Sequence, residues 1–201
     1  MKKKTCLFVF DIESRGKSAK RHGIVSVGAC YGEPGLTKQL VRWNVSPMPG
    51  QVFEQRCKEE LWDKNQELLK ALSRDQLEPG FFAQSFRALL NQLESQYEHI
   101  YLICDNPAFD AKMIDFYLDE FGFDSMQYKA DGREYRAVHD LDSYGQGMLG
   151  LGFENDWLSD ERHLGFLKDI RVPEQQKHYP EKDALDICLV YEALVARNNK
   201  K

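Results

Sequence analysis

Asp11 and Glu13 are the first residues whose types and spacing suggest chemistry. They follow five apolar residues, Cys6 to Phe10, that run without alternation, which is typical of a strand buried on both faces. Because side chains alternate along a strand, the two carboxylates point to the same side. Two acids in a half-buried place are hard to keep ionised without a cation, and Mg²⁺ or Mn²⁺ suits such oxygen ligands. An isolated pair of this kind is more often a solvated strand end, so the rest of the chain must decide.

Three more residues have the types that such a site needs. Asp110 begins an expected helix directly after a short apolar run, and Asp183 lies in the first turn of the expected last helix, five residues after His178. Taken singly, either acid is explained by the dipole at a helix N-terminus, and His178 by a surface position. The metal-site hypothesis therefore depends on whether the fold brings these residues together.

The apolar patterns predict the elements that must position these residues. The first three strands are expected to form an antiparallel meander, with a turn at residues 32–35, and a later strand leads into the helix that begins near Asp110. Residues 127–151 carry no clear pattern. The expected strands cover residues 5–14, 24–31, 39–45 and 99–104, and the expected helices cover residues 53–72, 83–97, 110–121 and 181–196, with a short helix inside 154–170.

Composition narrows the class of protein. The 201 residues fit one domain, expected over 1–201 with a core at about 5–196, and a hydrophobic fraction of 42% with no long apolar run predicts a soluble protein without a membrane segment. Asp11 interrupts the apolar run that follows the N-terminal lysines, so we expect an intracellular, cytoplasmic location. Five scattered cysteines without a Cys-x-x-Cys pair indicate neither a disulfide framework nor a zinc site. The net charge of −5 disfavours general electrostatic binding of nucleic acid unless divalent ions add positive charge.

The loop after the first strand, residues 14–23, holds four Lys or Arg residues. It is not a P-loop, because that motif requires Gly where this chain has Asp11. Such a loop is usually a solvated hairpin tip, but its place next to the two acids would let it steady a polyphosphate backbone.

The acids and the histidine resemble a known family when taken in order. Asp11–Glu13, Asn106–Asp110 and His178–Ala184 are similar to the three exonuclease motifs of the DEDDh superfamily, which includes proofreading exonucleases and oligoribonuclease. The resemblance implies an α/β, ribonuclease H-like fold, in which a mixed sheet of an antiparallel three-stranded meander plus parallel strands is flanked by helices. Two positions depart from the pattern: Asp105 stands where many members have His, and Pro180 where a small residue is common.

The resemblance also implies a reaction and its residues. A metal-dependent 3′→5′ exonuclease would hydrolyse single-stranded RNA or DNA to nucleoside 5′-monophosphates with two divalent ions, Mg²⁺ or Mn²⁺. Asp11 would bridge both ions, Glu13 and Asp183 would complete the first, Asp110 would support the second, and His178 would be the general base. Candidate substrate contacts, which are expected from position and resemblance, are Trp62 and Phe109 for base stacking, Ser14 and Gly16 through backbone N–H groups, and Asn106, which would either bond a ribose or fix the turn of its motif. Aromatic residues such as Trp62 and Phe109 are more often part of the core.

Two other functions fit parts of the pattern. A catalytically weak nucleic-acid-binding domain of the same fold would have no use for four acids and a histidine. An aspartate-nucleophile phosphatase would use Asp11 to attack phosphorus, but it explains neither His178 nor Asp183. The preference for RNA or DNA, the substrate length, the oligomeric state, the pathway and the role of residues 127–172 leave no signal in the sequence.

Overall fold

The first strand forms the centre of the sheet. β1 (Lys3–Ser14) pairs antiparallel with β2 (Ile24–Gly32), which pairs antiparallel with β3 (Gln39–Asn44), and on its other side β1 runs parallel to β4 (Tyr97–Cys104). The short β5 (Val138–Asp140) adds parallel to β4, so the strand order is β3-β2-β1-β4-β5. The computed structural model describes residues 3–130, 136–152, 157, 167 and 170–199. The predicted mixed sheet, with a three-stranded antiparallel meander and parallel strands, is confirmed.

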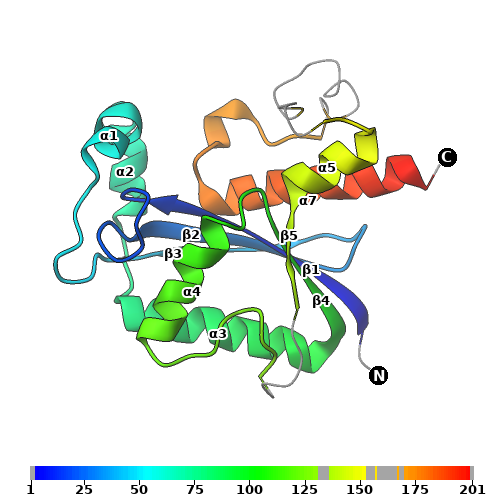
Figure 1. Ribbon diagram of the computed structural model, residues 1–201, viewed down its shortest axis with the longest axis horizontal. Coiled ribbons are helices and arrows are strands. Elements are labelled where there is room, and N and C mark those ends of the chain that lie inside the picture. The colour runs from blue at the N-terminus through cyan, green and yellow to red at the C-terminus, as the bar shows by residue number, and fades with distance from the viewer. Residues whose placement is uncertain (1–2, 131–135, 153–156, 158–166, 168–169, 200–201) are drawn as a thin grey trace.

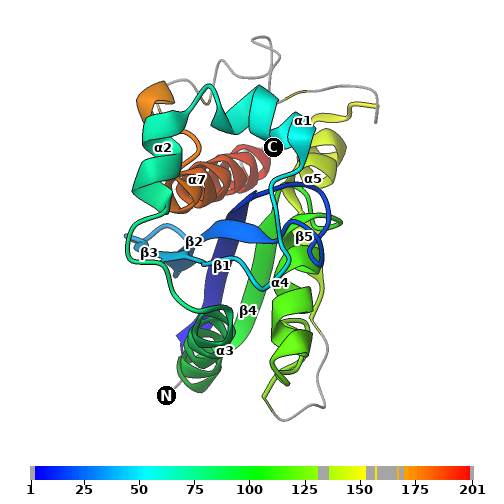
Figure 2. The same cartoon turned by 90° about the vertical axis from the view of Figure 1, so that its left-hand side faces the viewer.

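Helices cover both faces of this sheet, as Figures 1 and 2 show. On one face lie α3 (Pro79–Gln96) and α4 (Asp110–Glu120), and on the other lie α5 (Leu141–Leu149) and α7 (Pro180–Asn198). Residues of β1 alternate between the two layers: Phe8 and Phe10 pack in the cluster with α3 and α4, whereas Leu7 and Val9 pack in the cluster with α5 and α7. Burial on both sides explains the unbroken apolar run.

The helix predicted over residues 53–72 is wrong as a single element. The chain forms three short pieces: α1 (Gln55–Cys57), the π-helix η1 (Lys58–Trp62) and α2 (Gln66–Leu72). The wide turn is visible in the bond that the Asp63 N–H donates to the Lys58 carbonyl at 2.7 Å. It lets Trp62 reach a third buried cluster, with Val25 and Leu72. Tertiary packing of one aromatic side chain therefore overrides the local helical pattern.

The other boundaries lie close to their predicted places. α3 begins four residues earlier than expected, at Pro79, because proline fits the first turn of a helix, where its missing N–H costs nothing. Residues 127–151, which the sequence left unassigned, contain β5 and α5, and a 3₁₀ turn, η2 (Glu174–Gln176), precedes α7. The short helix predicted inside residues 154–170 lies largely outside the described residues. Within the described part of the chain, the hydropathy and length of the helices identify no membrane-crossing segment.

Candidate active site

The alternation along β1 places Asp11 and Glu13 on the α7 side of the sheet. They continue the odd-numbered series of Leu7 and Val9, whose side chains pack with α7 residues. The first turn of α7 lies directly over the neighbouring strand at Gly28, the register partner of Asp11. A Cβ at Gly28 would lie 1.9 Å from the Glu181 backbone nitrogen, so the absence of a side chain there permits this close approach. The geometry brings the start of α7 to the two acids.

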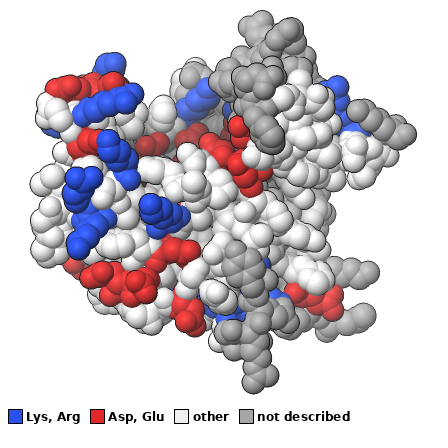
Figure 3. Space-filling model, viewed as in Figure 1, with Lys and Arg blue, Asp and Glu red and all other residues white. Residues whose placement is uncertain are grey.

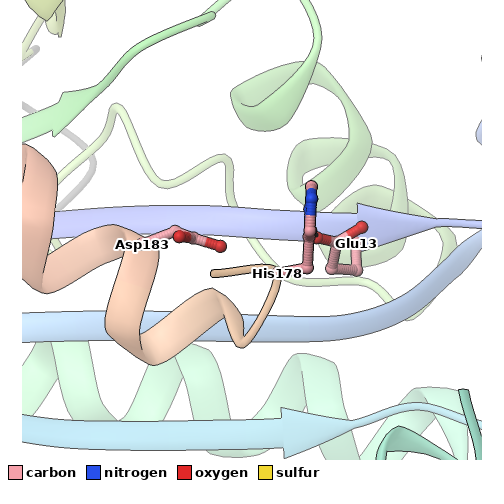
Figure 4. Close-up of side chains that lie close together, drawn as sticks. All are labelled: Glu13, His178 and Asp183. Carbon is pink, nitrogen blue, oxygen red and sulfur yellow. Dashed lines mark hydrogen bonds and ion pairs between the residues drawn. The ribbon is translucent and has the colours of Figure 1, made fainter. Parts of the chain in front are cut away.

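The start of α7 also positions His178 and Asp183 near the two acids. His178 adopts a left-handed backbone conformation, with φ of 64°, just before α7 begins. Its Nδ1 lies 3.2 Å from Oε1 of Glu13, and Figure 4 shows the Asp183 carboxyl pointing toward this pair. One ligand atom from each of Glu13, His178 and Asp183 lies within 4.8 Å of the others. Residues 165 positions apart in the chain thus form one cluster, which we call the first acidic cluster.

Asp110 reaches Asp11 from the other side because β4 runs parallel to β1. The carboxyl ends of the two strands meet at one edge of the sheet, and the chain turns after β4 into α4, whose first residue is Asp110. The turn is closed by the Asp110 N–H, which donates to the Asn106 carbonyl at 2.8 Å. Carboxylate oxygens of Asp11, Asp105 and Asp110 lie within 4.8 Å of one another and form the second acidic cluster.

Burial and mutual repulsion perturb the acids strongly. Burial first, and then the charge of Asp110, raises the pKa of Asp11 well above its usual value. For the same leading reason the pKa of Asp110 rises to about 8 and that of Asp183 to about 7. Burial also raises the pKa of Glu13, although the hydrogen bond with His178 opposes the rise, and that bond is the main cause that raises the pKa of His178. A divalent cation bound between these carboxylates would reduce their mutual repulsion and let them ionise together.

One carboxylate oxygen of Asp110 gives geometric evidence for a bound cation. Asp110 is only 3% exposed, and within the described residues its Oδ2 atom has no hydrogen-bond partner. A buried, unpartnered oxygen is costly in a folded protein unless an ion or water satisfies it. The donor set is rich in carboxylates and contains one imidazole, which suits a hard divalent ion such as Mg²⁺ or Mn²⁺. The residues present therefore fit the metal that the sequence pattern implies.

A cavity of about 250 Å³ opens over these groups. Arg171 and Asp186 form an ion pair in its wall, in which Arg171 Nε donates to Asp186 at 2.9 Å. Asp186 is buried, and its arginine partner belongs to residues 127–172, whose role the sequence does not reveal. A larger hollow of about 610 Å³ near Phe81 contains only two acids, Glu78 and Glu120, so its size does not make it the better candidate. The ionisable residues around the smaller cavity are Asp11, Glu13, Asp105, Arg171, Lys177, His178, Asp183 and Asp186.

The predicted substrate contacts fare differently from the acids. Trp62 is fully buried, and its indole N–H donates to the Ser14 carbonyl at 3.0 Å, so it takes the core position that is the commoner alternative to base stacking. The N–H of Gly16 donates to the Ser14 hydroxyl at 3.2 Å, so that N–H group is already engaged. Asn106 is exposed at the turn before α4, and Phe109 is half-buried against the core.

Sequence reasoning did not place Asp105 in the site. It was noted only as a departure from the family pattern, yet its position at the end of β4, beside the end of β1, puts it with Asp11 and Asp110. The available signal was its place directly after a buried parallel strand, since such strand ends collect polar side chains at one edge.

Solved structures with the same fold include exonuclease I proteins. The zinc-bound E. coli exonuclease I–ssDNA complex matches with a TM-score of 0.72 at 11% identity over 97% of this chain and 41% of that chain. The moderately thermophilic exonuclease I from Methylocaldum szegediense gives 0.71 at 13% identity, over 98% and 41%, and E. coli exonuclease I with a dT13 oligonucleotide gives 0.62 at 11%, over 98% and 41%. Searches with protein-family models and against curated proteins find no match. The chain spans less than half of the length of these exonucleases, and it has the ribonuclease H-like α/β fold that they share.

Proposed function

We propose that this chain is a metal-dependent 3′→5′ exonuclease domain. It hydrolyses the terminal phosphodiester bond of single-stranded RNA or DNA and releases nucleoside 5′-monophosphates. The observation that carries the proposal is that members of both acidic clusters line a single cavity at the start of α7. The fold shared with exonuclease I structures supports the same reaction class.

Two divalent ions, Mg²⁺ or Mn²⁺, are the proposed cofactors. Asp11 would contact both, Glu13 and Asp183 would hold the first, and Asp110 would hold the second. When bound, such a pair activates a water on one side of phosphorus and stabilises the leaving oxygen on the other. The acids themselves bind and orient the ions, and their burial limits the water that would compete for these positions.

His178 is the proposed general base. Its side chain is 52% exposed at the mouth of the site, and its Nδ1 faces Glu13. An imidazole with a pKa near neutrality can accept the proton of an attacking water once the ring is neutral. Among the described residues, the exposed imidazole makes one hydrogen bond, with Glu13, so rotation of the ring toward substrate would break a single contact.

The neighbouring surface suits a polyanion. Figure 3 shows acidic side chains gathered in the upper middle of one face, with basic side chains to their left. In the loop between β1 and β2, the exposed Lys17 is paired with Glu54 at 3.0 Å. The same loop contributes the exposed Lys20 and Arg21. A strand whose 3′ end enters the acidic cavity can therefore lay its backbone phosphates on these side chains.

The test is digestion of matched 5′-labelled single-stranded RNA and DNA with Mg²⁺, Mn²⁺ or EDTA. Wild type should produce a ladder that shortens from the 3′ end and disappears with EDTA. Asp11→Ala and His178→Ala should abolish it, whereas Asp119→Ala, an exposed acid at the far end of α4, should retain it. Strands that are bound but left whole with either metal would contradict the proposal and favour a catalytically weak binding domain of the same fold.

A further inference from the structure

Asp105 is not one of the four acids of the predicted metal site, yet it lies beside two of them, Asp11 and Asp110. One of its carboxylate oxygens is within 4.8 Å of an oxygen from Asp11 and one from Asp110. It also lines the cavity, whereas Asp110 lies behind it at the start of α4. An exposed aspartate after a strand would ordinarily turn toward water, away from two other carboxylates.

We propose that Asp105 is a fifth metal-ligating carboxylate, so that three protein side chains, Asp11, Asp105 and Asp110, hold the second divalent ion. This inference rests on the proposed exonuclease function and deepens it. The first observation behind it is the closeness of the three carboxylates. The second observation is the buried Oδ2 of Asp110, which has no hydrogen-bond partner among the described residues and belongs to the same cluster.

The distances allow one ion to be shared. Oxygens bound to a single Mg²⁺ at about 2.1 Å lie about 3 Å apart in adjacent positions and about 4 Å apart in opposite ones. The three oxygens are already within 4.8 Å of one another. Asp105 is exposed and lies outside α4, so its side chain can rotate toward a shared ion without a change in the helix.

The extra carboxylate changes the charge balance of the site. Four ionised carboxylates carry a charge of −4, so a charge of −2 remains once the first divalent ion is bound. A fifth carboxylate makes that remaining charge −3, which strengthens the attraction for the second ion before any phosphate arrives. The second ion should therefore bind to the protein without nucleic acid.

Binding of Mn²⁺ alone tests this without a substrate. Free Mn²⁺ is measured by electron paramagnetic resonance while it is titrated into wild type, Asp105→Asn, Asp11→Asn and the control Asp119→Asn. Wild type and Asp119→Asn should each bind two ions. Asp105→Asn should keep one ion unchanged and bind the other at least about tenfold more weakly. Asp11→Asn, which removes the proposed shared ligand, should weaken both.

The outcomes separate the two proposals. If wild type binds two ions and Asp105→Asn matches it, or if Asp105→Asn weakens both ions equally, the assignment of Asp105 to the second ion is overturned while the exonuclease proposal stands. If wild type binds no Mn²⁺, the exonuclease proposal fails together with it. Asp105 is exposed in a turn, so circular dichroism of Asp105→Asn should match wild type.

Discussion

Asp110 should make the metal-free protein less stable as the pH rises. The side chain is 3% exposed, its Oδ2 has no partner among the described residues, and burial raises its pKa from 3.8 to about 8. The folded protein therefore holds a proton that the unfolded chain releases near pH 4. Because the unfolded state binds fewer protons between these values, unfolding becomes easier as the pH rises from about 4 to 8, and the effect ends above that range.

The size of this effect follows from the two pKa values. The full shift of Asp110 corresponds to about 6 kcal/mol, of which about 4 kcal/mol falls between pH 5 and pH 8. Asp110→Asn keeps the shape and the polar oxygen but cannot ionise. In EDTA the variant should therefore be more stable than wild type at pH 8, and the gain should shrink by about 4 kcal/mol toward pH 5.

Urea unfolding followed by tryptophan fluorescence in EDTA, at several pH values from 5 to 8, measures this difference. Asp119→Asn is the matched control, since Asp119 lies on the same helix but is exposed, and its curve should follow wild type. Free energies of unfolding for Asp110→Asn that stay parallel to wild type across the whole range would show that the Asp110 carboxyl does not hold a proton in the folded state. Asp110 would then be paired or hydrated in solution.

The remaining predictions address the histidine, the basic loop and the packing of α7. In EDTA, NMR titration should show that Glu13→Gln lowers the pKa of His178, because the hydrogen bond with Glu13 is the main cause that raises it; an unchanged pKa would contradict the contact. Replacing Lys20 and Arg21 together by Gln should make the salt dependence of single-strand binding shallower by about 1.4 in log K against log salt, and an unchanged slope would place the strand elsewhere. Gly28→Ala should destabilise the fold by about 1–3 kcal/mol, measured by urea unfolding, because its Cβ would overlap the start of α7. Wild-type stability in that variant would show that the strand and helix can separate at no cost.

The main sheet could be predicted because its signals are local. An unbroken apolar run marks β1, and the period of two then places Asp11 and Glu13 on one face. Asp110 was found because a strand that leads into a helix fixes both the end of the strand and the first turn of the helix. These features depend on neighbours in the chain, so the sequence carries them.

The errors concern features that depend on contacts made far along the chain. The π-helical turn before Trp62 forms because that side chain packs with Val25 and Leu72, which no local pattern reveals. β5 has only three residues, too few for a periodic signal. Asp105 gains its neighbours from the parallel pairing of β4 with β1. Burial, pairing and close approach are properties of the folded chain, so stacking by Trp62 could not be excluded beforehand.

The proposal that this site removes nucleotides from a free 3′ end is tested most directly with one oligonucleotide in linear and circular form. Both are incubated with Mg²⁺, and the products are identified by mass spectrometry. The account predicts nucleoside 5′-monophosphates from the linear strand and no product from the circle. Cleavage of the circle, or release of 3′-monophosphates from the linear strand, would contradict it.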